Sequence, residues 1–132
     1  MKARRKSPEY DLYGAVATYL KYQYPRVLYH FDPTGLSLSK TQSGKLKAIQ
    51  RGSGYPDLFI IEPDKNGQYK GLFIEIKPEG TNIYKKDHLH YGSEHIREQA
   101  LYMDQLIIRG FKAVFGVGFD NIKRILDSYL RG

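Results

Sequence analysis

Two apolar segments joined by a turn constrain the fold of this chain more than any other feature. Leu58–Ile61 and Leu72–Ile76 consist largely of isoleucine, leucine and phenylalanine, and Pro63–Gly67 lies between them. That linker ends in Asn-Gly, which favours a tight turn because both residues readily adopt positive φ. The pattern therefore predicts two adjacent antiparallel strands of a hairpin at the centre of the chain.

Three other segments carry helical patterns. Apolar residues at helical spacing predict a first helix that begins at Pro8 and is stopped by Pro25. Ser93 is expected to cap a second helix that runs to Arg109, and Asp120 is expected to cap the last helix. Each of these helices has an apolar stripe on one side, so each should pack against a sheet.

Two further strands complete the predicted architecture. Val27–Phe31 and Ala113–Val117 are short apolar runs of the strand type. Residues 32–54 are rich in Gly, Ser, Thr and Lys, and they predict a long loop with only a short helical turn near Leu46–Ile49. The order α-β-β-β-α-β-α predicts a single α/β domain over residues 1–132, with one mixed β-sheet flanked by helices.

The composition excludes several classes of protein. No apolar run approaches the roughly 20 residues that a membrane-spanning helix needs. Residues 1–7 are expected to form a basic, flexible tail and not a signal peptide, because no apolar stretch follows them. The chain has no cysteine for disulfides or zinc, and three histidines, His88, His90 and His95, lack an apparent fourth zinc ligand. These features fit an intracellular, cytoplasmic protein.

The charge favours a polyanionic partner. Lysine and arginine number 21 against 14 acidic residues, which gives a net charge of +7. Such an excess is typical of proteins that bind nucleic acids, although a solubilising surface charge is the simpler alternative. Basic residues gather in two predicted loops, and we expect them to contact DNA phosphates: Lys40, Lys45, Lys47 and Arg51 before the hairpin, and Lys85 and Lys86 after it.

A carboxylate interrupts the second strand of the hairpin. Side chains alternate along a strand, so Glu75 and Lys77 share the face of Phe73. Burying a carboxylate in such a run is costly unless it is paired or binds a cation. An exposed edge strand with a Glu–Lys surface pair is the alternative interpretation.

Asp57 is the second acid of the predicted site. It starts the first strand of the hairpin, and antiparallel pairing would bring it close to Glu75, near the end of the other strand. Two carboxylates and a strand carbonyl form an all-oxygen site, which suits Mg²⁺ or Mn²⁺. With Lys77 on the same face, the set indicates phosphodiester hydrolysis. The alternative is that Asp57 only caps a turn after the Gly-rich residues before it.

Gln99 is a polar residue within the apolar stripe of the helix after Ser93. It lies three residues after Ile96 and four before Met103, so it should face the sheet. A buried amide must satisfy both its donor and its acceptor, through the backbone or through the lysine of the site and a water. On helix geometry alone, a structural role is at least as well supported as a functional one.

Several motifs together closely resemble the VRR-NUC family, the virus-type replication-repair nuclease branch of the PD-(D/E)xK superfamily: Gly54–Ile61, Gly71–Lys77, and Gln99–Tyr102 followed by Gly110. The resemblance spans nearly the whole chain and implies a restriction-endonuclease-like α/β core. It also covers Glu9, the acid of the first helix, which it places near the metal or its water shell. The chain departs from the family at Phe31–Gly35, where an Asn is frequent, and in the longer, more charged loop after Lys77.

The resemblance implies an activity and a role for each site residue. Asp57, Glu75 and the backbone carbonyl of Ile76 would bind Mg²⁺ or Mn²⁺, Lys77 would be the catalytic lysine, and Gln99 would support the site. The implied reaction is hydrolysis of DNA phosphodiester bonds. Similar stand-alone members act as homodimers on branched DNA such as Holliday junctions, whose two-fold symmetry suits a symmetric dimer.

Two other functions stay open on the sequence. The first is a non-catalytic, basic DNA-binding module with the same fold, and the second is a nuclease that acts on single-stranded ends or RNA. The intact trio of Asp57, Glu75 and Lys77 favours a nuclease, because a degenerate member would be expected to have lost one of them.

Overall fold

One mixed sheet organises the protein in the computed structural model, which describes residues 8–32, 39–50, 52 and 54–132. The strand order is β1-β2-β3-β4, with the bounds Tyr29–Phe31, Leu58–Ile60, Leu72–Lys77 and Lys112–Val117. β1 and β3 both run antiparallel to β2, whereas β4 runs parallel to β3. The predicted hairpin is therefore confirmed as β2 and β3, with Leu58 opposite Ile74.

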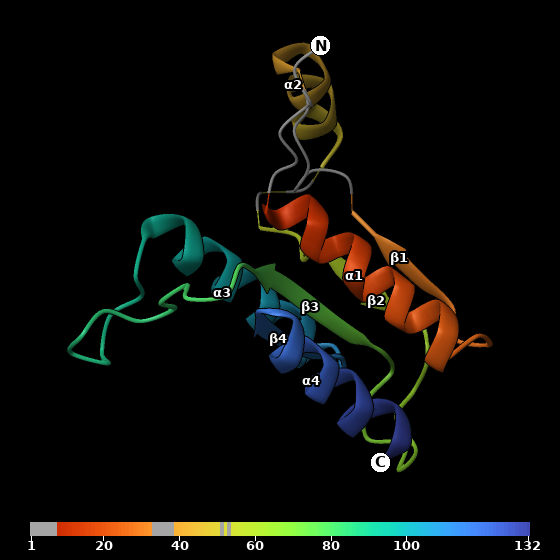
Figure 1. Ribbon diagram of the computed structural model, residues 1–132. Helices are drawn as coiled ribbons and strands as arrows, with labels where there is room; N and C mark the ends of the chain where they lie inside the picture. The colour runs from red at the N-terminus through yellow and green to blue at the C-terminus, as the bar shows by residue number, and fades with distance from the viewer. Residues whose placement is uncertain (1–7, 33–38, 51, 53) are drawn as a thin grey trace.

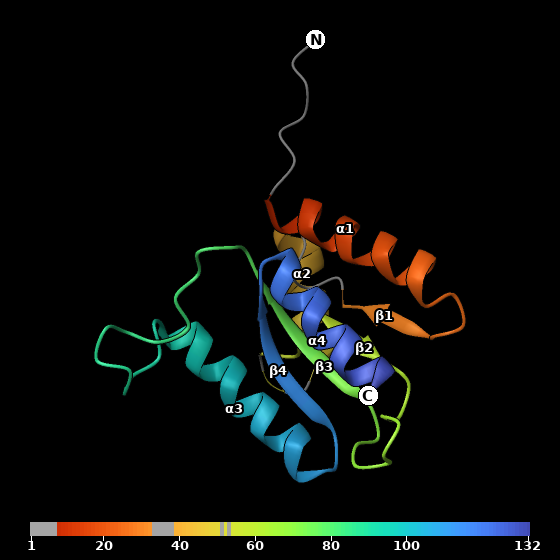
Figure 2. The same cartoon turned by 60° about the horizontal axis from the view of Figure 1, so that its bottom comes forward.

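Helices cover both faces of this sheet (Figure 1). Their bounds are Pro8–Gln23 for α1, Lys40–Ile49 for α2, Glu94–Ile108 for α3 and Phe119–Arg131 for α4. α1 and α4 lie against each other on one face, and α3 lies on the other (Figure 2). No helix in the described ranges is long and apolar enough to cross a membrane.

The alternation of side chains along β3 divides the core into two clusters. Ile74 and Ile76 point to the face of α1 and α4, where they join the larger cluster with Val16 and Leu126. Phe73 points to the opposite face, where the second cluster also contains Met103 of α3 and Ala113 of β4. Glu75 has the same strand parity as Phe73, so the acid is on the α3 face of the sheet.

α2 is a helix where the sequence predicted a loop with one short helical turn. Ser39 and Gln42 form a reciprocal capping box, because each backbone N–H donates to the other side chain at 3.1 Å. None of the described side chains of α2 is buried. The start of α2 is therefore fixed by local hydrogen bonds. With this helix included, the order of elements along the chain is α-β-α-β-β-α-β-α.

The predicted capping residue of the last helix is also corrected. α4 begins at Phe119 with Gly118 as its N-cap, and no side chain makes a capping hydrogen bond there. Asp120 lies inside the first turn, where its negative charge suits the positive end of the helix dipole. Ser93, in contrast, caps α3 as predicted, because its side-chain oxygen accepts a hydrogen bond from the N–H of Ile96 at 3.2 Å.

Candidate active site

Asp57 and Glu75 lie opposite each other at the open end of the β2–β3 hairpin, away from the turn that joins the two strands. Extending the register by one residue beyond Leu58 and Ile74 pairs these two acids. Asp57 Oδ2 accepts a hydrogen bond from the backbone N–H of Ile76 at 2.8 Å. Both side chains are buried, with 5% of Asp57 and 3% of Glu75 exposed. The fold therefore brings together the two carboxylates that the sequence singled out.

Gln99 connects α3 to the acid of β3. Its Nε2 donates to Glu75 Oε1 at 2.8 Å, and the residue is 5% exposed. The same nitrogen lies 3.2 Å from His95 Nε2, one helical turn earlier. An amide nitrogen only donates, so His95 Nε2 is the acceptor in this contact. The amide is thereby held with its nitrogen toward the acid.

Gln99 also has a buried acceptor. Its Oε1 makes no hydrogen bond within the described part of the chain. A buried amide oxygen of this kind is costly unless a donor or a water reaches it. The sequence left open whether Gln99 serves the core or the site, and the structure places its amide on the acid, inside the site.

A close backbone contact sets the distance between the Asp57 segment and α3. Gly54 adopts φ +93°, and a Cβ at this position would lie 3.0 Å from the Glu98 carbonyl and 3.1 Å from Gln99 Cα. Only glycine allows so close an approach without strain. Tyr55, next in the chain, packs edge-on against Phe73 with ring centroids 5.8 Å apart. Burial, Tyr102 and Asp32 raise the pKa of Tyr55 above its usual range.

The other predicted catalytic residues lie on β3 and α1. Lys77 is the last residue of β3 and is half-buried, and its carbonyl accepts a hydrogen bond from Gly118 at 2.9 Å. Ile76, whose carbonyl was predicted to bind metal, precedes it on the same strand. Glu9 lies in the first turn of α1, and its side chain is outside the described residues.

Two residues near the site were not predicted as part of it. Asp32 is a third buried acid, and its N–H donates to the Asp57 carbonyl at 2.8 Å. The sequence marked its segment only as a departure from the VRR-NUC pattern. His95 was weighed only as a zinc ligand, although its i, i+4 spacing to Gln99 is the signal for their contact.

The donor atoms at the site fit a hard cation. Asp57 takes part in none of the ion pairs found among the described residues, and yet it is buried. Buried carboxylates need a cation or several donors, and oxygen ligands suit Mg²⁺ or Mn²⁺. No group of three or more His, Cys, Asp or Glu side chains that could hold a metal occurs in the described residues. Among the described side chains, Asp57 and Glu75 are the two that we consider as metal ligands, with backbone oxygens beside them.

Four of the predicted DNA-binding residues have exposed side chains on two segments of the chain. Lys40 and Lys45 are exposed on α2, and Lys85 and Lys86 are exposed between β3 and α3. Lys47 belongs to α2, but its side chain is outside the described residues, as is Arg51 entirely.

The sheet order, the helices on its two faces and the position of the acids define the restriction-endonuclease-like α/β fold. Among solved structures, a VRR_NUC domain protein matches this chain with a TM-score of 0.64 and 24% sequence identity. The match covers 97% of this chain and 92% of that protein. The likeness confirms the predicted fold class and, at the level of the fold, the resemblance to the VRR-NUC family. No family profile and no curated protein matches the chain.

Proposed function

We propose that this protein is a metal-dependent deoxyribonuclease that hydrolyses DNA phosphodiester bonds. The observation that carries the proposal is the pair of buried carboxylates, Asp57 and Glu75, held opposite each other on adjacent strands. The name of the VRR_NUC structural neighbour and the net charge of +7 support it. Clusters of buried ionisable groups, whose desolvation costs free energy, are typical of active sites.

The metal site would be formed by Asp57, Glu75 and the Ile76 carbonyl, with Glu9 as a further acid from α1. A bound Mg²⁺ or Mn²⁺ would lower the pKa of an attacking water and stabilise negative charge on the phosphate. The protein orients both side chains before any ligand arrives. Ile76 N–H fixes the carboxylate of Asp57, and the Gln99 amide fixes that of Glu75. Carboxylates oriented in advance lose little entropy when they bind the metal.

Lys77 and Gln99 would assist the reaction. Lys77 follows Glu75 by two residues, so the alternation of β3 gives it the same face as the acid. A positive charge there stabilises the pentacovalent phosphate, and the ammonium can orient the attacking water. Gln99 is a positioning residue, since it acts through Glu75.

The substrate we propose is branched DNA, such as a Holliday junction, cleaved by a homodimer. The exposed lysines of α2 and of the β3–α3 connection would hold the phosphates. A symmetric dimer would present two sites to the two equivalent strands of a junction.

Cleavage assays on matched substrates test the proposal. Four-way junction, flap, duplex, single-stranded DNA and RNA are incubated with Mg²⁺, Mn²⁺ or chelator. Cleavage of branched DNA that depends on the cation is expected. Asp57→Asn and Glu75→Gln should abolish it and keep DNA binding, whereas Asp104→Asn, a change at an exposed acid of α3, should not matter. Wild-type cleavage by Asp57→Asn would overturn the assignment, and binding without cleavage by the wild type would favour a non-catalytic module.

A further inference from the structure

The connection between β3 and α3 forms a hairpin that projects from the body of the protein. We call residues 81–92 the arm, and Figures 1 and 2 both show it extending away from the sheet. Gly92 N–H donates to the Ile83 carbonyl and Lys85 N–H to the His90 carbonyl, each at 2.8 Å. Between these bonds, Tyr84 and Tyr91 form an antiparallel bridge. Their rings stack with centroids 5.3 Å apart. The arm is therefore an ordered element with its own pairing.

A glycine closes the base of the arm. A Cβ on Gly92 would lie 2.6 Å from the Asn82 carbonyl oxygen, which is closer than real side chains approach. The two segments of the arm can therefore approach this closely at residue 92 only because glycine has no side chain.

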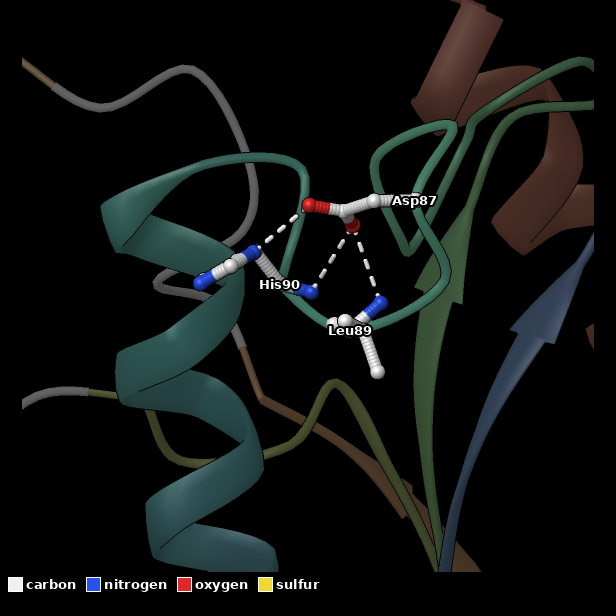
Figure 3. A network of polar contacts seen from close by, with 3 residues as sticks. All are labelled: Asp87, Leu89 and His90. Carbon is white, nitrogen blue, oxygen red and sulfur yellow. Dashed lines mark hydrogen bonds and ion pairs between the residues drawn. The ribbon is translucent and has the colours of Figure 1, made fainter.

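One carboxylate organises the tip of the arm (Figure 3). Asp87 Oδ1 accepts the N–H groups of Leu89 at 2.9 Å and of His90 at 3.1 Å, and Oδ2 lies 2.7 Å from His90 Nδ1. His88, between them, adopts φ +57°, a left-handed conformation that histidine tolerates better than most residues. The bonds fix the backbone on both sides of His88, and the turn holds Leu89 in one place.

The ordered tip presents an apolar side chain to solvent. Leu89 is 82% exposed, the most exposed of the large apolar residues described. Lys85 and Lys86 are exposed beside it, and Tyr84 is half exposed. A flexible loop could fold such a leucine inward, but the Asp87 bonds hold it out. An exposed apolar side chain flanked by lysines is complementary to a nucleic acid, because the side chain can contact a base face while the lysines contact phosphates.

Both ends of the arm connect to elements that carry candidate site residues. Residue 81 comes four residues after Lys77, the end of β3, and residue 92 directly precedes Ser93, the N-cap of α3. His95 and Gln99 follow within the first turns of that helix and contact each other. DNA held at Asp57 and Glu75 would therefore pass beside the arm.

We propose that the arm is a wedge that reads exposed base steps in DNA, with Leu89 inserted against unstacked bases and Lys85 and Lys86 on the flanking phosphates. The inference rests on the proposed nuclease function and deepens it, because it assigns the choice of substrate to a surface outside the metal site. Unstacking costs least where bases are already unpaired or at a branch. The wedge would therefore favour branched over continuous duplex DNA.

Binding experiments with Ca²⁺ in place of Mg²⁺ separate this proposal from catalysis. A fluorescent base analogue, 2-aminopurine, is placed at the branch point of a four-way junction or inside a continuous duplex. Its emission rises when the base unstacks. The wild type should raise emission on the junction, and Leu89→Ala should lose that rise. Leu89→Ala should also bind the junction about tenfold less tightly, because a buried leucine is lost from the complex. Affinity for the duplex should stay unchanged.

Three further variants complete the test. Leu89→Met keeps an apolar tip and should keep the rise in emission. Leu28→Ala removes an exposed leucine at the opposite end of the sheet and should behave as wild type. Lys85→Gln with Lys86→Gln should weaken binding to both DNAs and reduce the salt dependence. A full rise in emission with Leu89→Ala would overturn the wedge even if the protein cleaves DNA, whereas failure of the wild type to cleave in Mg²⁺ would overturn the proposed function alone.

Discussion

Gln99 on α3 and Glu75 on β3 are joined by a buried hydrogen bond of 2.8 Å between Nε2 and Oε1. The bond links a helix to a strand that it covers, and it is a direct polar contact between the two elements at the site. Because the acid is buried, the amide determines where its charge points.

Removing the amide should affect both activity and stability. Gln99→Ala removes the hydrogen bond that Nε2 donates to Glu75 Oε1, so we expect cleavage to fall by about 10- to 100-fold. The free energy of unfolding should fall by about 1–3 kcal/mol, as for other buried groups that lose a partner. Single-turnover rates and urea titrations measure the two effects. A lower stability at an unchanged rate would assign Gln99 to the core alone.

His95 should affect the cleavage rate indirectly, through its contact with Gln99. It accepts the second hydrogen of the Gln99 amide, so His95→Phe allows the amide to rotate away from Glu75. We expect a rate reduction smaller than that of Gln99→Ala and an unchanged affinity for DNA. The double variant should be no slower than Gln99→Ala, because both changes act through one bond. Additive losses would contradict this order of contacts.

Lys77 should matter for the reaction and not for metal binding. Lys77→Ala is expected to reduce the cleavage rate by on the order of 100-fold or more, because it removes a charge that acts in the transition state. Calorimetry should show Mn²⁺ binding close to that of wild type. Weak Mn²⁺ binding in this variant would show that the change disturbs the acids.

Salt dependence should identify the DNA-binding surface on α2. Lys40→Gln with Lys45→Gln removes two exposed charges, so the slope of log affinity against log salt should fall by about two units. The matched control is Lys65→Gln with Lys70→Gln, two exposed lysines in the turn between β2 and β3. If the slope is the same for the α2 variant as for the control variant, the DNA-binding surface is not on α2.

Acid should weaken the contact between α1 and α4. The hydroxyls of Tyr19 and Tyr24 donate to Asp127 Oδ1 at 2.5 and 2.6 Å. Burial works against the charged form, but these bonds and nearby Arg131 and Lys123 hold the pKa of Asp127 below its usual range.

A lowered pKa of this kind determines the pH range of the effect. The folded form holds its proton less tightly than the unfolded form, so the stabilisation is complete above the ordinary pKa near 4 and is lost as the pH falls through the folded value. Asp127→Asn should lower the melting temperature at pH 7 and flatten its dependence on pH below about 4. If the melting temperature of Asp127→Asn depends on pH as that of the wild type does, Asp127 is not the group that makes the fold sensitive to acid.

The sequence predicted those parts of the fold that depend on local patterns. The β2–β3 hairpin followed from two apolar runs and Asn66-Gly67, and its register then placed Asp57 opposite Glu75. α2 was missed because its helix has no buried stripe to reveal it, although Ser39 and Gln42 carry a capping signal. The turn at the tip of the arm was missed because it depends on one side chain, Asp87.

The contact between Gln99 and Glu75 could be predicted only in part. Helical spacing indicated that Gln99 faces the sheet, and the structure confirms its burial. Which acceptor it meets depends on how far α3 is displaced and rotated over β3, and this is decided by packing around Phe73 and Met103. Long-range packing of this kind leaves no periodic trace in the sequence.

Gly54 has a consequence for how this site tolerates mutation. Since a Cβ there would meet the α3 backbone at Glu98 and Gln99, any substitution would push either the loop or the helix outward. Both movements would change the distance between Gln99 and Glu75 without altering either residue. Gly54 therefore restricts mutation at the site as strictly as the two acids do. A laboratory selection for faster variants should yield no substitution at residue 54.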